Sequence, residues 1–139
     1  MANFSNFLEN SIVNWLDGQA MPAATGSLWV ALYSGALDQN NAATNLIGFT
    51  TPRVEVSSWT VTTASNSSDS VADASITNAA DIPMTSVSNV AATATHFGVF
   101  NASTGGNLLF HGPLAGSGVS IALYDSVKFA AGAITLTVQ

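Results

Sequence analysis

Charge is what this 139-residue chain has least of, because charged residues make up only 7% of it. An average soluble domain carries about 25%. Hydrophobic residues nevertheless reach 47%, so the chain differs from disordered proteins, which are poor in apolar residues. A surface with so little charge repels copies of itself only weakly. We therefore expect neighbouring subunits to cover part of the surface; the alternative is a solitary domain of unusual composition.

Basic residues, cysteine and long apolar runs are scarce or missing as well. Arg53 and Lys128 oppose eight acidic residues, and the formal net charge is −6. Proteins that bind nucleic acid or anionic membranes neutralise phosphates with Lys and Arg, so we expect neither partner. The lack of cysteine excludes disulfides and thiolate zinc sites. With no basic, apolar leader and no apolar run near the ~20 residues of a membrane span, we expect neither a signal peptide nor a transmembrane segment.

The first apolar pattern along the chain is helical. Its residues recur every three or four positions between about residues 4 and 17, which places them on one face of a helix. Asn3 is a suitable N-cap and Gly18 a suitable C-terminal stop. We expect this apolar face to pack on the core of the chain, with docking onto a neighbouring subunit as the alternative. The face includes Phe4, Phe7, Leu8, Ile12, Trp15 and Leu16.

From about residue 27 to residue 139 the pattern changes to short alternating runs separated by Gly, Pro, Asn and Ser. Such runs are typical of strands joined by turns. Leu28–Tyr33 is apolar at both odd and even positions, which predicts a strand covered on both faces. We therefore predict a single domain over residues 1–139, mainly β, folded as an antiparallel β-sandwich or jelly-roll-like barrel with one N-terminal α-helix.

A hairpin is predicted around Asn101–Gly106, because adjacent glycines supply the positive φ angles that a tight reversal needs. If Asn101 pairs with Gly106, His96 faces His111 across the two strands. A three-residue loop would separate the two histidines. As a facing pair they could hold a metal or act as a pH-sensitive contact. The alternative is two strand imidazoles bonded to backbone or water, and since further ligands are lacking nearby we predict no metal site.

Two further groups of residues are candidates for ligand contacts. Asn66, Asp69 and Asp73 lie in a Ser-rich stretch, where the turn chemistry of Asn and Asp is a better explanation than calcium binding. Trp59 or Tyr33, if exposed beside Asp or Asn side chains, would suit a sugar ring.

The two basic side chains are expected to form modest ion pairs. Arg53 has Glu55 two residues away, on the same face of the predicted strand, and an acidic residue of the N-terminal helix is a second candidate partner. Lys128 and Asp125 are close enough to pair across a bend.

Signatures of catalysis are missing from the sequence. It contains no G-x-S-x-G elbow, no phosphate-binding glycine loop with Lys and no H-E-x-x-H. We therefore predict a protein without catalytic residues and without a cofactor. A small hydrolase remains the alternative, and it would require a serine, a histidine and a carboxylate in one pocket.

Several segments together resemble a family of small bacteriophage virion proteins, commonly labelled tail-fibre or minor structural proteins. The most specific are Thr95–Ala102, Gly105–Leu109, Gly112–Leu114 and the closing run Phe129–Thr137. Phe7–Asn10, Leu28–Tyr33 and Arg53 also resemble the family's opening helix, its first strand and the start of its next strand.

The resemblance implies a non-enzymatic virion protein, made in the cytoplasm of the host bacterium. The hypothesis we prefer is a capsid decoration (cement) protein that binds the major capsid protein as a homo-oligomer, for which a trimer is one arrangement. The alternative is a tail-fibre or tail-tip component that contacts tail proteins and a host glycan. The residues we expect at subunit contacts are Phe4, Phe7, Leu8, Trp15, Val119, Ile121 and Leu123.

Overall fold

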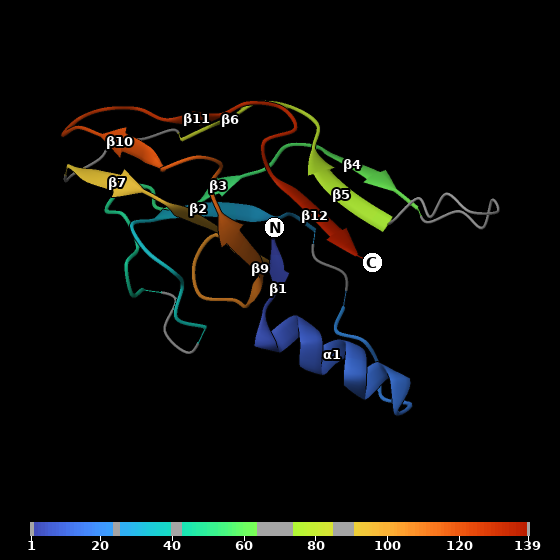
Figure 1. Ribbon diagram of the computed structural model, residues 1–139. Helices are drawn as coiled ribbons and strands as arrows, with labels where there is room; N and C mark the ends of the chain where they lie inside the picture. Colours follow the sequence, from blue (N-terminus) through green and yellow to red (C-terminus); the bar gives the residue numbers. More distant parts are fainter. Residues whose placement is uncertain (1, 24–25, 40–42, 64–73, 85–90, 139) are drawn as a thin grey trace.

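The computed structural model describes residues 2–23, 26–39, 43–63, 74–84 and 91–138 (Figure 1). Within these residues the chain forms antiparallel strands and one helix, α1, at Asn6–Leu16. The strands are β1 (Asn3–Phe4), β2 (Trp29–Tyr33), β3 (Val54–Glu55), β4 (Trp59–Thr62), β5 (Ala74–Asn78), β6 (Ile82–Pro83), β7 (Ala92–Ala94), β8 (His96–Phe100), β9 (Leu108–Pro113), β10 (Val119–Ile121), β11 (Lys128–Phe129) and β12 (Thr135–Val138). The predicted mainly β, sandwich-like fold with one N-terminal helix is confirmed.

The strands form one large sheet and three small ones, and every strand pairing in them is antiparallel. The large sheet has the order β1-β9-β8-β2-β3. The small sheets are β10-β7, β11-β6 and β12-β5-β4. The main core lies between the large sheet and the small ones, because its buried residues come from both sides, including Val30 and Phe110 on one and Ile82, Ile121 and Ile134 on the other.

Strand β2 is buried on both faces, as its sequence predicts. Val30 and Leu32 belong to the main core, whereas Ala31 and Tyr33 lie in a second cluster on the opposite face of the large sheet. Gly98 on the neighbouring strand allows this second cluster to pack closely. A Cβ atom at that position would lie 2.7 Å from the Leu37 side chain.

The sheet β12-β5-β4 has two chemically different faces. Cross-strand neighbours on its outer face are all hydroxyl residues, and Thr77 and Thr135 are hydrogen-bonded there at 2.9 Å between their Oγ1 atoms. The inner face is mostly apolar, buried at Ile134 and exposed toward Val61 and Val138. The strand registers give the outer face the residues Thr60, Thr62, Ser75, Thr77, Thr135 and Thr137.

Helix α1 starts later than the sequence suggested. Asn3 and Phe4 form β1, which pairs with β9, so Ser5 takes the place of Asn3 as N-cap and accepts a hydrogen bond from the Leu8 amide at 3.2 Å. The helix ends at Leu16, and Gly18 follows with φ of 88°, as a C-terminal stop requires. Among the described residues, no helix has the length and apolar character needed to cross a membrane.

The predicted register of the β8-β9 hairpin is wrong. His96 lies opposite Pro113, and His111 lies opposite Gly98, so the two histidines do not face each other. The loop is longer than predicted, because the Asn101 side chain accepts a hydrogen bond from the Asn107 amide at 2.7 Å. The register also shifts between Val99 and Phe100, which leaves one extra residue in β9.

Candidate functional site

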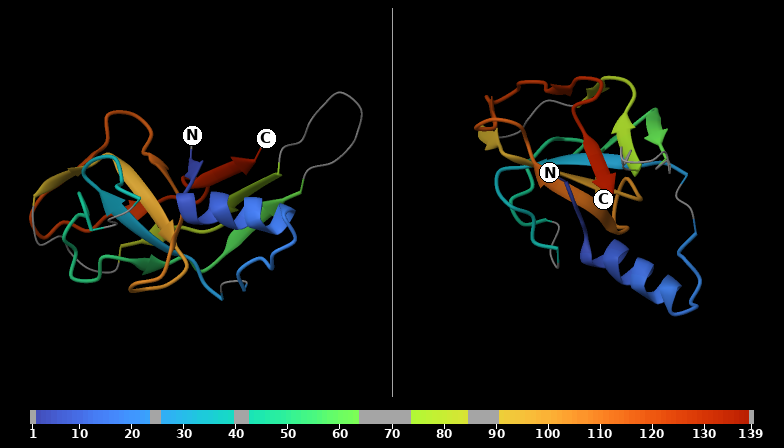
Figure 2. Two further views of the ribbon diagram at one scale, coloured as in Figure 1. Left: turned by 90° about the horizontal axis from the view of Figure 1, so that it is seen from below. Right: turned by 45° about the vertical axis from the view of Figure 1, so that its right-hand side comes forward.

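The outer half of α1 exposes large apolar side chains. Val13, Trp15 and Leu16 are 63%, 55% and 73% exposed, whereas Phe7 and Leu8 nearer the start of the helix are half-buried. The expected packing of the whole apolar face on the core is therefore wrong for this half. Figures 1 and 2 show the helix extending away from the sheets.

The helix is attached to the sheets mainly at its first turn. The Ser5 hydroxyl donates a hydrogen bond to the Leu108 carbonyl, and the Ser5 amide donates to the Leu109 carbonyl at 2.9 Å. Both acceptors lie at the start of β9. Exposed apolar side chains that gather on one element often mark a contact surface. Val13 and Leu16 are three residues apart and are neighbours on the helix surface, and Trp15 directly precedes Leu16 in the sequence. We call these three residues the helix patch.

The second segment that we expected at subunit contacts, residues 119–123, exposes only some of its apolar side chains. Val119 and Leu123 are 43% and 47% exposed, but Ile121 is 1% exposed and belongs to the main core. Ile121 is therefore a core residue and cannot contact a neighbouring subunit in this fold. Tyr124, in the turn that follows β10, is 71% exposed with φ of 70°, a rare conformation for a large side chain.

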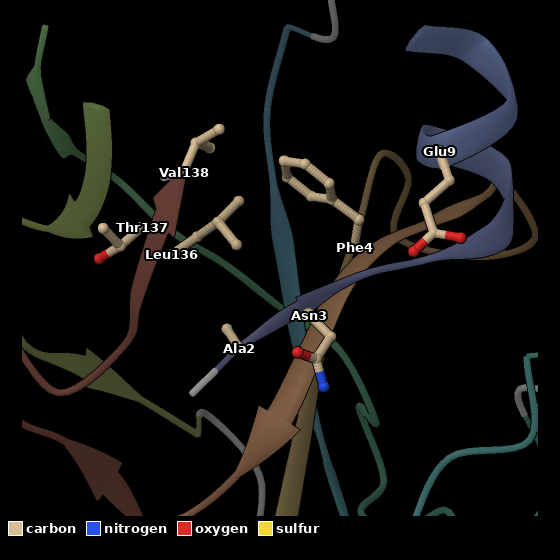
Figure 3. A pocket seen from close by; sticks show the side chains of 7 residues that line it. All are labelled: Ala2, Asn3, Phe4, Glu9, Leu136, Thr137 and Val138. Atoms are coloured by element: carbon tan, nitrogen blue, oxygen red, sulfur yellow. The ribbon is translucent and has the colours of Figure 1, made fainter. Parts of the chain in front are cut away.

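A groove of about 360 Å3 separates the N-terminal segment from β12. Figure 3 shows the Phe4 side chain and the Leu136 side chain directed into the space between the two strands. Glu9, in the first turn of α1, lies on the same side as Phe4. The described residues that line it are Ala2, Asn3, Phe4, Glu9, Leu136, Thr137 and Val138. Of these, only Phe4 was expected from the sequence at a contact with another subunit.

The two histidines are placed separately but remain close enough to interact electrostatically. His96 shares a hydrogen bond of 2.9 Å between its Nδ1 atom and the Thr95 hydroxyl. Burial, with a smaller contribution from the charge of His96, lowers the pKa of His111, and Glu9 opposes this change. No group of three or more His, Cys, Asp or Glu residues among those described is arranged to hold a metal ion. The turn with Asn66, Asp69 and Asp73 lies outside the described residues.

Neither aromatic residue considered for a sugar contact is suitably exposed. Tyr33 is fully buried, and its burial raises the pKa of its hydroxyl to about 12 even though nearby Arg53 acts in the opposite direction. Trp59 is half-buried and packs edge-on against Phe110, with ring centroids 6.3 Å apart. The side chain of Trp59 is therefore part of the packing around the main core.

Both predicted ion pairs are wrong. Arg53 donates hydrogen bonds to the carbonyls of Ala102 and Gly105, at 2.9 and 2.6 Å, and its guanidinium lies 3.6 Å above the Phe100 ring. Its function is to hold the hairpin loop, which a local sequence pattern does not reveal. Lys128 pairs with Asp81 at 2.8 Å.

Asp125 and Glu55, the predicted acidic partners, bind other groups. The Asp125 carboxylate accepts a hydrogen bond from the Ala122 amide at 2.9 Å, which closes a turn. Glu55 accepts one from the Ser27 hydroxyl. These two carboxylates therefore stabilise a local turn and a strand, and neither pairs with the basic residue that the sequence suggested.

The comparisons with known proteins identify the family of the chain. No curated protein matches it closely enough to suggest a function. A protein-family model described as "Podophage GP4 fiber I protein gp80" matches residues 3–137, which is nearly the whole chain and agrees with the resemblance found in the sequence. The chain therefore belongs to the podophage GP4 fiber I protein gp80 family.

Proposed function

We propose that this chain is a non-enzymatic structural subunit of a phage fibre and is located in the virion. The observation that carries the proposal is the match to a fibre-protein family over residues 3–137. The description of the family as a fibre protein favours the fibre over capsid decoration, which is the role that we preferred from the sequence.

The arrangement of polar residues supports a structural role. His96 is bonded to Thr95, and His111 is half-buried. No hydrogen bonds among the described residues join a serine, a histidine and a carboxylate, which is the combination that a hydrolase of this type would use. The polar contacts at Arg53 and Asp125 hold loops and turns in place.

The helix patch is the surface that we assign to contact with a neighbouring subunit, most simply another copy of this chain. Burying a Leu or Val side chain contributes about 1.5–3 kcal/mol, and the patch adds Trp15, which is large and half exposed. Because the patch contains no charged residue, the contact should weaken only slightly with salt. Many copies in one particle would add such modest contacts together.

The position of the protein in the particle tests the fibre assignment. Electron microscopy of intact particles, with the chain labelled by a specific antibody, should place it on fibres at a few to a few dozen copies. Label spread over the head at hundreds of copies would instead favour capsid decoration and would overturn the proposal.

Substitution of the helix patch tests the contact surface. Trp15→Glu combined with Leu16→Glu should prevent incorporation into particles while leaving the fold of the isolated chain intact, because both side chains are mostly exposed. Asn10→Glu, on the same helix but outside the patch, is the matched control and should be incorporated normally. Release of the wild-type protein from particles by 1 M NaCl alone would contradict an apolar contact.

A further inference from the structure

Among the strands that the structure describes, none pairs with the outer edge of β12, which faces the groove. The sheet order β12-β5-β4 places β12 at the end, and the Asn78 amide donates to the Ile134 carbonyl at 3.1 Å. Hydrogen-bonded pairs alternate along an antiparallel ladder, so the backbone groups of Leu136 point toward β5. Those of Thr135 and Thr137 therefore point away from the sheet, and Thr137 lines the groove.

This edge lacks the features that normally protect an exposed strand. Proteins place charged residues, proline or bulges on free edges to prevent pairing with other chains. Strand β12 reads Thr-Leu-Thr-Val, with no charge and no proline, and its pairing with β5 is regular. By contrast, the edge strand β3 carries Glu55 and follows Pro52 and Arg53.

The groove beside this edge has the shape and polarity for an extended peptide. Phe4, Leu136 and Val138 provide apolar walls, and the volume is about 360 Å3. In Figure 3 the Phe4 ring and the Leu136 side chain project into the gap between β1 and β12. A strand added at the β12 edge would place every second side chain on the same face as Leu136 and Val138.

The charge of the groove distinguishes between possible occupants. The Glu9 carboxylate lines it, and this side chain makes neither a hydrogen bond nor an ion pair with another described residue, although its charge acts to raise the pKa of His111. The occupant is therefore expected to bring a basic side chain. A second copy is poorly suited to provide one, because Lys128 already pairs with Asp81 and Arg53 holds the hairpin loop. The net charge of −6 also favours a basic partner.

We propose that the groove between β1 and β12 binds an extended, apolar segment with a Lys or Arg side chain, supplied by a different virion protein and added as a strand to β12. The proposal rests on the proposed function, because it describes how the fibre subunit would bind a different protein of the virion. The basic side chain lies against Glu9, and the backbone of the segment bonds to Thr137.

Synthetic peptides test the recognition with the isolated full chain. Two fluorescein-labelled nine-residue peptides of alternating Val and Thr would differ only at the centre, which is Lys in one and Glu in the other. Fluorescence anisotropy should show the Lys peptide binding about two- to fivefold more tightly, the range expected for an exposed charge pair. Glu9→Lys should reverse the preference without affecting the fold, because Glu9 is exposed.

Proline substitutions test the use of the strand edge. Thr137→Pro removes an outward-facing amide and should weaken the Lys peptide by about tenfold or more. Val61→Pro is the matched control, because it removes an outward-facing amide on β4, the opposite edge of the same sheet, and should leave binding unchanged. Circular dichroism would show whether each variant is folded. If Thr137→Pro does not fold, Glu9→Lys still tests the proposal.

The possible outcomes separate this proposal from others. Failure of both peptides to bind at 1 mM, or an unchanged preference in Glu9→Lys, would overturn it. Self-association of the chain that Thr137→Pro abolishes would identify a second copy as the occupant and would also overturn it. None of these results depends on where the protein lies in the particle, so the fibre assignment stands or fails separately.

Discussion

The Asn78 side chain should be one of the main sources of stability in this fold, although it is polar. It is 1% exposed, and its amide nitrogen donates to the carbonyls of Ala80 and Ala130 at 2.8 and 2.9 Å. Its Oδ1 atom accepts from the Ile134 amide at 2.8 Å. One side chain therefore connects the end of β5 to the two segments that precede β12.

The expected cost of Asn78→Ala follows from the three groups that lose their partner. The Ile134 amide is buried, and an unpaired buried donor costs about 1–3 kcal/mol. The two carbonyls are only partly buried, so water can replace some of each bond, and about 0.5–1 kcal/mol each is reasonable. The sum is a loss of about 2–5 kcal/mol, from a total stability that is typically 5–15 kcal/mol.

Urea unfolding followed by circular dichroism measures this loss. With a slope of about 1–3 kcal/mol per molar urea, a loss of about 2–5 kcal/mol should lower the midpoint by about 0.7–5 M. Thr77→Ala is the matched control on the same strand, because it removes one exposed hydrogen bond, to Thr135, and should cost about 1 kcal/mol or less. If Asn78→Ala costs no more than Thr77→Ala, the reasoning from unpaired buried groups is refuted.

Three other predictions concern the loop, the histidine and a turn. Arg53→Met should cost about 1–3 kcal/mol and increase hydrogen exchange at the Asn107 amide, because the loop loses two hydrogen bonds; unchanged exchange would show that Arg53 does not hold it. Because burial lowers the pKa of His111 in the folded chain, the unfolded chain binds a proton more readily, and the free energy of unfolding should fall as the pH drops below about 6.5. His111→Gln should reduce this fall between about pH 7 and 5.5. The same pH profile in the variant and the wild type would show that His111 does not cause the fall. Gly118→Ala should lower the urea midpoint, because a Cβ atom would lie 2.4 Å from the Ala94 carbonyl oxygen at φ of 91°, whereas Gly116→Ala has open space around it and should cost less.

The features that the sequence predicted well depend on local pattern. The apolar spacing of residues 4–17 identified the helix and its C-terminal glycine, and the alternation of Leu28–Tyr33 identified a strand buried on both faces. Hydrophobic periodicity expresses burial directly, so these elements could be recognised without a structure. The family resemblance was also confirmed, because the residues that carry it are spread over most of the chain and the family model matches residues 3–137.

The features that were missed depend on contacts between distant segments. Residues Asn3 and Phe4 join a strand because β9 pairs with them, which moved the helix start to Ser5. The hairpin register depended on one hydrogen bond, which the Asn107 amide donates to the Asn101 side chain, and on one bulge. In the same way, Arg53 binds carbonyls some fifty residues away, and the groove combines the two ends of the described chain. The signal that could have suggested the groove is the uncharged alternation of Thr135–Val138 at a strand edge.

The attachment of α1 through its first turn also affects how the protein can evolve. The fold depends on Ser5 and the strand beside it, whereas Trp15 and Leu16 lie in the half of the helix that contributes little to the core. Substitutions at exposed sites usually change stability by no more than about 0.5 kcal/mol. Under the proposed contact at the helix patch, a few mutations in the outer half of the helix would change which surface the subunit binds, while the β-sandwich would remain unchanged.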